Sequence, residues 1–154
     1  MLGTNDLQPK MHKIPFTREH LADGLIHLIK LIRSLPECGA GNQPAKILVV
    51  APPPIKMAKG RPEVSEKYGC EAGVILSHEF ASAYKDAAKA YHCGYLDAGL
   101  YAEAGDADGV HFTMESHPRL GKAIAETILA MDANNDGNTD EKHTVDKLKA
   151  DIEM

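Results

Sequence analysis

The sequence has 154 residues, of which 44% are hydrophobic and 25% are charged, as in an ordinary soluble globular domain. Its formal net charge is −5, and it contains no cluster of Lys and Arg. Nucleic acids and anionic membrane surfaces are therefore disfavoured as partners, because binding to either needs a basic patch. A small neutral or weakly charged substrate fits this charge better.

No stretch approaches the roughly 20 apolar residues that a bilayer span needs. Residues 1–10 also lack the apolar core of a signal peptide. As written, the chain is expected to be cytoplasmic, although a missing amino-terminal segment could have carried an export signal. Cys38, Cys70 and Cys93 are widely spaced and form no C-x-x-C pair, so we expect free thiols and no cofactor.

The first half of the chain predicts a strand end, a helix and a buried strand. Residues 1–6 turn from apolar to polar, which suits the end of a strand that runs into a loop. Thr17 is expected to cap an amphipathic helix that ends before Pro36. Residues 47–50 (Ile-Leu-Val-Val) form an unalternating aliphatic run, which is typical of a strand buried on both faces in a parallel sheet.

The second half continues the alternation. Residues 55–74 show no period and read as one long loop, after which Ser77 is expected to cap a helix that reaches about Tyr91. Residues 93–98 predict a short strand, and Pro118 opens a last helix with four inward apolar residues, Leu120, Ile124, Ile128 and Leu129. The order of elements predicts an α/β fold.

Asp108-Gly-Val-His111 is the strongest local motif, placed between a predicted strand and a predicted helix. A turn of this length can set the carboxylate against Nδ1–H of the imidazole and leave Nε2 free to take a proton, which makes a general base. Taken alone, the spacing favours an ordinary turn that holds a solvated Asp and a capping His.

Gly3-Thr-Asn5-Asp6 stands at the predicted strand end, where α/β proteins place ligand-binding loops. Gly3 permits a close backbone approach, and the Asn5 amide can donate to a developing oxyanion. By itself this segment favours a plain Gly-Asn turn.

Taken together, the motifs resemble the SGNH/GDSL-type serine ester hydrolases, most closely their arylesterase and acyltransferase-like branch. The matching segments are Met-Leu-Gly-Thr-Asn-Asp, Ile-Leu-Val-Val-Ala-Pro-Pro-Pro, Tyr-Leu-Asp-Ala-Gly and Asp-Gly-Val-His-Phe-Thr, at residues 1–6, 47–54, 95–99 and 108–113. The resemblance covers residues 1–131. It implies a three-layer, flavodoxin-like parallel sheet and hydrolysis of small esters through an acyl-enzyme.

The resemblance also implies roles for four residues. Gly3 and Asn5 match the family's third block, in which the Asn donates to the oxyanion. Asp108 and His111 match the fifth block, in which the His is the base and the Asp orients it.

The nucleophile block of the family has no counterpart here. The family's Gly-Asp-Ser block precedes Gly-x-Asn-Asp by two strand-helix units, about 60 to 80 residues, but only Met1 and Leu2 do so in this chain. None of the serines has a Gly-x-Ser context: Ser34, Ser65, Ser77, Ser82 and Ser116. We therefore expect the carboxyl-terminal part of a hydrolase domain, incomplete on its amino-terminal side and inactive alone. The alternative is a non-catalytic fragment that forms a homo-oligomer or complements a missing amino-terminal fragment.

Residues 132–154 are rich in Asn, Asp, Lys and Glu and read as a polar, mobile tail. Asp132, Asn134, Asp136 and Asp140 follow the spacing of an EF-hand calcium loop, but His143 stands where the bidentate Glu belongs. We favour a solvated linker over a weak calcium site.

Overall fold

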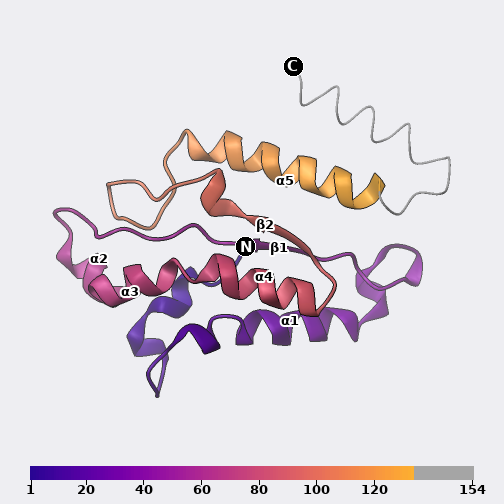
Figure 1. Cartoon of the computed structure of the whole chain (residues 1–154), viewed down its shortest axis with the longest axis horizontal. Helices are drawn as coiled ribbons and strands as arrows, with labels where there is room; N and C mark the ends of the chain where they lie inside the picture. Colours follow the sequence, from indigo (N-terminus) through magenta and orange to yellow (C-terminus); the bar gives the residue numbers. More distant parts are fainter. Residues whose placement is uncertain (134–154) are drawn as a thin grey trace.

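A computed structural model describes residues 1–133, in which two parallel strands alternate with helices (Figure 1). Strand β1 (Leu48–Ala51) pairs in parallel with β2 (Gly94–Asp97), with Leu48 opposite Gly94 and Ala51 opposite Asp97. The helices are α1 (Asp23–Arg33), α2 (Pro62–Lys67), α3 (Cys70–Ser77), α4 (Phe80–Ala90) and α5 (Ser116–Ala133). Short 3-10 turns occupy Thr4–Leu7, Pro9–Met11, Arg18–His20, Pro36–Cys38, Ala40–Asn42 and Ala98–Leu100.

Both faces of the strand pair are buried by helices, which gives three layers (Figure 1). Successive side chains of a strand point to opposite faces. Val49 and Ala51 accordingly pack in one core with residues of α1 and α4, whereas Val50 packs with Leu96 and residues of α5 in the other. This double burial explains the unalternating aliphatic run, and the predicted α/β fold with a parallel sheet is confirmed.

The segment 55–74 is not the single loop that we predicted. It contains α2 and the beginning of α3, joined at Tyr68 and Gly69. Pro62 is well placed at the first turn of α2, because its missing N–H would have had no partner there. The helix is only six residues long, which is too short for a hydrophobic period to appear in the sequence.

Two predicted helix starts are also wrong in detail. Ser77 is the last residue of α3, and α4 begins only at Phe80. The Ser77 hydroxyl donates to the carbonyl of Val74 in the preceding turn, so it closes one helix instead of opening the next. Thr17 caps the 3-10 turn Arg18–His20 together with His20, and α1 starts after that turn.

The predicted strand end at residues 1–6 is absent from the described structure. Thr4–Leu7 forms a 3-10 turn, and Met1 and Leu2 lie in no regular element. In the last helix Leu120 is buried as expected, but Ile128 is 45% exposed.

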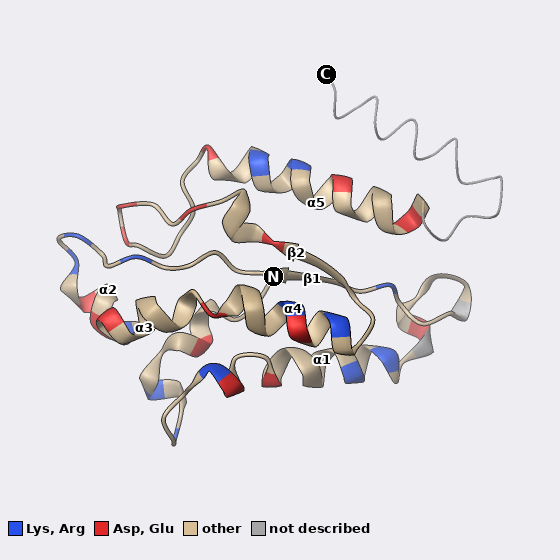
Figure 2. Ribbon diagram, viewed as in Figure 1, with Lys and Arg blue, Asp and Glu red and all other residues tan. Residues whose placement is uncertain are grey.

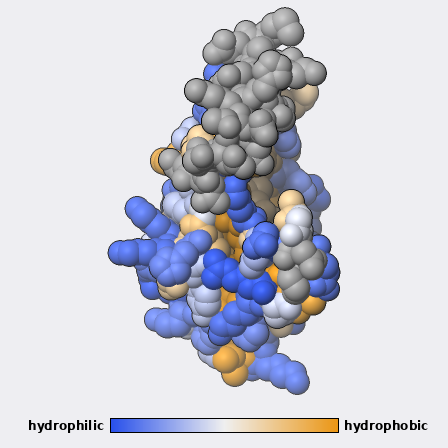
Figure 3. Space-filling model, turned by 90° about the vertical axis from the view of Figure 1, so that its right-hand side faces the viewer, coloured by the Kyte–Doolittle hydropathy of each residue, from blue (hydrophilic) through white to orange (hydrophobic). Residues whose placement is uncertain are grey.

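Charged residues of both signs are spread over the helices and loops (Figure 2), and the face in Figure 3 is largely hydrophilic with small apolar areas between the polar side chains. None of the described helices combines the length and apolarity that a membrane crossing requires. Asp132 lies in α5 and forms an ion pair with Lys46 at 2.9 Å, whereas Asn134, Asp136 and Asp140 lie outside the described residues. The calcium loop and the tail stay predictions.

Candidate active site

Asp108 and His111 form a hydrogen-bonded pair within one turn. Asp108 Oδ1 accepts the backbone N–H groups of Val110 and His111, both at 2.9 Å, and Oδ2 lies 2.5 Å from His111 Nδ1. The bond to the His111 ring, helped by these two N–H groups, lowers the pKa of Asp108 to about 2. An ionised carboxylate can only accept, so Nδ1 carries the proton of this bond and Nε2 of the neutral ring keeps a lone pair.

Gly109 anchors this turn to the segment that follows β1. Its carbonyl accepts the N–H of Lys56 at 2.8 Å, and its own N–H donates to Gly105 at 2.9 Å. Its φ of 72° favours glycine, and a Cβ built there would lie 2.2 Å from the Lys56 carbonyl oxygen. The His111 side chain is 87% exposed and therefore open to a reacting group.

Asn5 lies in the 3-10 turn Thr4–Leu7 and is exposed. Its side-chain Oδ1 accepts two hydrogen bonds, one from Gln8 Nε2 at 3.0 Å and one from the Tyr68 hydroxyl at 3.1 Å. The other end of the amide, Nδ2, has no hydrogen-bond partner among residues 1–133. The Asn5 side chain thus presents a free donor.

Gly3 lets the chain lie directly on α4. A Cβ at Gly3 would lie 2.4 Å from the Tyr84 hydroxyl oxygen and 2.9 Å from a ring carbon of Phe80, and its φ is 126°. Tyr84 donates its hydroxyl proton to the Leu2 carbonyl at 2.9 Å, and burial raises the pKa of Tyr84. Gly3 of the Gly3-Thr-Asn5-Asp6 motif is therefore needed because a larger side chain would clash with α4.

Tyr68 connects the two predicted groups of site residues. Its hydroxyl reaches Asn5, and its side chain lines the same small crevice as Asp108, together with Ile55 and Val110. The prediction from sequence missed Tyr68 and Gln8. The sequence around Tyr68 has no hydrophobic period or motif that would mark it as a site residue. Gln8 stands three residues after Asn5, a spacing that indicates no more than a local contact within a turn.

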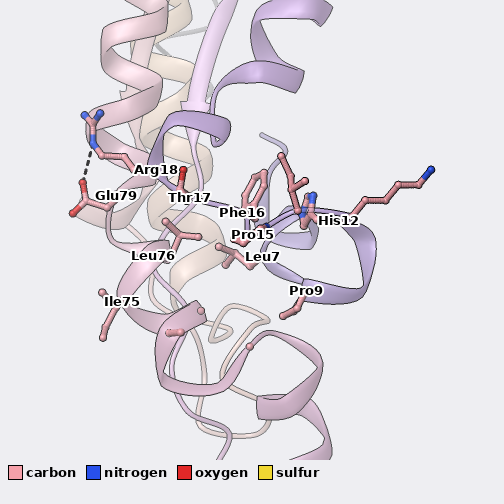
Figure 4. A pocket seen from close by; sticks show the side chains of 15 residues that line it. Leu7, Pro9, His12, Pro15, Phe16, Thr17, Arg18, Ile75, Leu76 and Glu79 are labelled. Atoms are coloured by element: carbon pink, nitrogen blue, oxygen red, sulfur yellow. Dashed lines mark hydrogen bonds and ion pairs between the residues drawn. The ribbon is translucent and has the colours of Figure 1, made fainter.

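An apolar groove of about 700 Å³ lies beside this region, between α3 and the segment that follows the Asn5 turn. Figure 4 shows Leu7, Phe16 and Leu76 along it, with the ion pair of Arg18 and Glu79 at one end. Neither Asn5 nor His111 lines it.

The described residues show no group of three or more His, Cys, Asp and Glu side chains that could hold a metal ion. None of the serine hydroxyls in the described part of the chain hydrogen-bonds to His111. The chemistry that these side chains can offer is therefore proton transfer by His111 and hydrogen-bond donation by Asn5.

Neither a protein-family model nor a curated protein sequence matches this chain. Among solved structures, two carbohydrate acetylesterases from Sinorhizobium meliloti are similar, with TM-scores of 0.75 and 0.74 at 28% and 32% identity. Each match covers 85% of this chain and 59% of the other. The aryl esterase of M. smegmatis matches with a TM-score of 0.72 at 30% identity, over 84% of this chain and 58% of its own length.

The fold and its neighbours define an esterase-like α/β protein with a parallel sheet. More narrowly, the resemblance to the SGNH-type ester hydrolases that the motifs predicted is confirmed. The chain spans less than two thirds of the length of the esterases that it matches.

Proposed function

We propose that this chain supplies the general base and an oxyanion donor for the hydrolysis of small esters. The observation that carries the proposal is the pair of Asp108 and His111, in which the carboxylate holds Nδ1–H and the exposed ring offers Nε2. The free Nδ2 of Asn5 supports the second role. Carbohydrate acetates and aryl esters are the substrate classes that the names of the similar esterases suggest.

In the proposed reaction a serine Oγ attacks the ester carbonyl while His111 Nε2 takes the serine proton. Asp108 holds the ring in the correct tautomer and stabilises the imidazolium, and Asn5 donates to the oxyanion of the tetrahedral intermediate. His111 then returns the proton to the departing alcohol, which leaves an acyl-enzyme. Water then attacks the acyl-enzyme while His111 Nε2 takes the water proton. His111 returns this proton to the serine oxygen, which releases the carboxylic acid and regenerates the serine.

The serine nucleophile is proposed to come from residues that this chain does not contain. Ser77 and Ser116 are buried, and the Ser65 hydroxyl accepts the N–H of Ala58 in the crevice lining. The other two serine hydroxyls donate to backbone carbonyls three residues earlier in the chain, Ser34 to Leu31 and Ser82 to Glu79.

The test is hydrolysis of p-nitrophenyl acetate by the chain joined, ahead of Met1, to an amino-terminal segment that carries a Gly-Asp-Ser block. We expect turnover that His111→Ala reduces about 10³-fold or more. His27→Ala, a change of an exposed histidine on α1, should leave turnover unchanged. A joined protein that is folded by circular dichroism and either has no turnover or keeps it without His111 overturns the proposal.

A second proposal is that the chain acts as a non-catalytic fragment, which forms a homo-oligomer or complements an amino-terminal partner. It is supported by the free edges of the sheet, because β1 and β2 pair only with each other among the described residues. Unpaired strand edges readily accept another strand. A stable, inactive oligomer by light scattering would favour this function, and a compact active monomer would contradict it.

A further inference from the structure

We propose that Tyr68 and Gln8 are positioning residues that hold the Asn5 amide with its N–H groups toward the substrate, an inference that rests on the proposed role of Asn5 as oxyanion donor. Neither residue belongs to a motif that the sequence offered. Both act through Asn5 and are not expected to touch the substrate themselves.

The first support is the geometry at Asn5. Two donors meet on the same oxygen, Gln8 Nε2 from the neighbouring turn and the Tyr68 hydroxyl from a segment 63 residues further along the chain. The carboxamide is planar, so fixing Oδ1 on one side places Nδ2 on the other. In this arrangement Gln8 Nε2 donates and Asn5 Oδ1 accepts.

The second support is the gradient of burial across this cluster. Gln8 is 6% exposed and Tyr68 is 8% exposed, whereas Asn5 is exposed. The fixed end of the amide therefore points into the protein and the free donor points outward. An oxyanion donor needs this arrangement, because a donor that is oriented in advance costs no reorganisation when the charge develops.

The alternative to this arrangement is a freely rotating amide. The last torsion of an Asn side chain is broad and roughly two-fold, so an unrestrained Asn5 would present Oδ1 to the oxyanion about as readily as Nδ2. The carbonyl end would repel the developing negative charge. Hydrogen bonds to Oδ1 also polarise the amide and strengthen its N–H groups as donors.

Tyr68 is itself held in place by the backbone at the end of α2. Its N–H donates to the carbonyls of Val64 and Ser65, both at 3.2 Å, and Lys67 Nζ lies 5.3 Å from the centre of its ring. Tyr68 and Asp108 both line one small crevice, so the residue that holds Asn5 lies near the Asp108–His111 turn.

The first arm of the test measures the order of the Asn5 side chain in the chain as it is. ¹⁵N relaxation of the Nδ2H₂ group should show a rigid amide, which Tyr68→Phe and Gln8→Met each loosen, toward order parameters below about 0.6 when combined. Tyr91→Phe is the matched control, since no hydrogen bond of the Tyr91 hydroxyl is present among the described residues. An amide that is equally mobile with and without Tyr68 and Gln8 overturns the inference.

The second arm uses the joined, ester-hydrolysing protein. Asn5→Ala should lower kcat about 10²- to 10³-fold. Tyr68→Phe should lower kcat about 10-fold with KM unchanged, and should have no further effect in the Asn5→Ala background, as in a double-mutant cycle of coupled residues. Matching thermal unfolding curves establish that each variant is folded.

The outcomes of this arm separate the two proposals. If Asn5→Ala lowers kcat but Tyr68→Phe combined with Gln8→Met does not, the positioning role is wrong and the proposed function stands. If Asn5→Ala leaves kcat unchanged, the oxyanion role of Asn5 is wrong, and the positioning role of Tyr68 and Gln8 fails with it. Additive effects of Tyr68→Phe and Asn5→Ala also overturn the positioning role.

Discussion

The carboxylate of Asp108 and the imidazole of His111 are oriented by a single backbone turn. Oδ2 lies 2.5 Å from Nδ1, while Oδ1 of the same carboxylate accepts the N–H of His111. The orientation of the two groups relative to each other is therefore set within four consecutive residues, and the contact of Gly109 with Lys56 anchors that turn.

The tautomer of His111 follows from this geometry. With Asp108 ionised, neutral His111 should carry its proton on Nδ1, and Asp108→Ala should shift the ring toward the Nε2–H form. Long-range ¹H–¹⁵N correlation spectra of the imidazole at neutral pH distinguish the two forms. A ring that is already protonated mainly on Nε2 in the unmodified chain would contradict the geometry.

The low pKa of Asp108 predicts a pH-dependent contribution to stability. The folded value of about 2 lies below the ordinary value of 3.8, so the ionised carboxylate favours the folded state. The contribution is complete above about pH 5 and is lost as the pH falls through about 4 toward 2. Asp108→Asn keeps an acceptor for the two N–H groups but removes the charge.

Because the His111 ring is largely exposed and solvent screens the pair, we expect Asp108→Asn to lower the free energy of unfolding at pH 7 by on the order of 1 kcal/mol. Urea unfolding at a series of pH values should show this difference shrinking below about pH 4. A difference that is constant from pH 7 to pH 3 would exclude the carboxylate as its source.

Gly109→Ala tests the anchoring of the turn. The new Cβ would meet the Lys56 carbonyl at 2.2 Å in a backbone conformation with positive φ. We expect a loss of about 2 to 4 kcal/mol in the free energy of unfolding. Gly121→Ala is the control, because that position in α5 is open and a helical Gly→Ala change should stabilise by up to about 1 kcal/mol. Equal effects at both positions would argue against the Lys56 contact.

Ser77→Ala tests a buried polar link between α3 and the segment after β1. The Ser77 hydroxyl accepts the N–H of Ile55 at 3.1 Å, and the variant would leave that buried N–H without a partner. A loss of about 1 to 3 kcal/mol is expected in urea unfolding. Ser34→Ala removes an exposed hydroxyl that donates to Leu31 and should cost less than about 0.5 kcal/mol. Similar losses for both would show that burial is not the cause.

The sequence predicted those parts of the fold that have a strong hydrophobic pattern. Val49 and Val50 are both buried, on opposite faces, so the aliphatic run pointed directly to a covered parallel strand. The short helices α2 and α3 were not predicted, because neither is long enough to show a recurring apolar face in the sequence. The boundary at Ser77 failed for a physical reason as well, since a serine hydroxyl can bond backward to a helix carbonyl as well as cap the next helix.

Prediction of the site depended on how local each contact is. Asp108 and His111 are three residues apart, so their spacing in the sequence allowed us to predict the hydrogen bond between their side chains. The distant partner of Asn5 is Tyr68, and a single hydrogen bond between residues so far apart in sequence leaves no periodic or spacing signal. The roles of Gly3, Asn5, Asp108 and His111 in catalysis stay proposals.

The connection from β1 to β2 has a consequence for the order of folding. The strand pair closes over residues 52–93, and the contact of Asn5 with Tyr68 closes over residues 6–67, so both contacts depend on long loops. The entropy of closing such loops must be lost before the contacts form, which makes them late and slow compared with helix formation. The hydrogen bonds within the four residues of the Asp108–His111 turn, in contrast, close only a very short loop and can form early. We therefore expect the Asn5 donor to reach its final orientation late in folding, after the Asp108–His111 turn has formed.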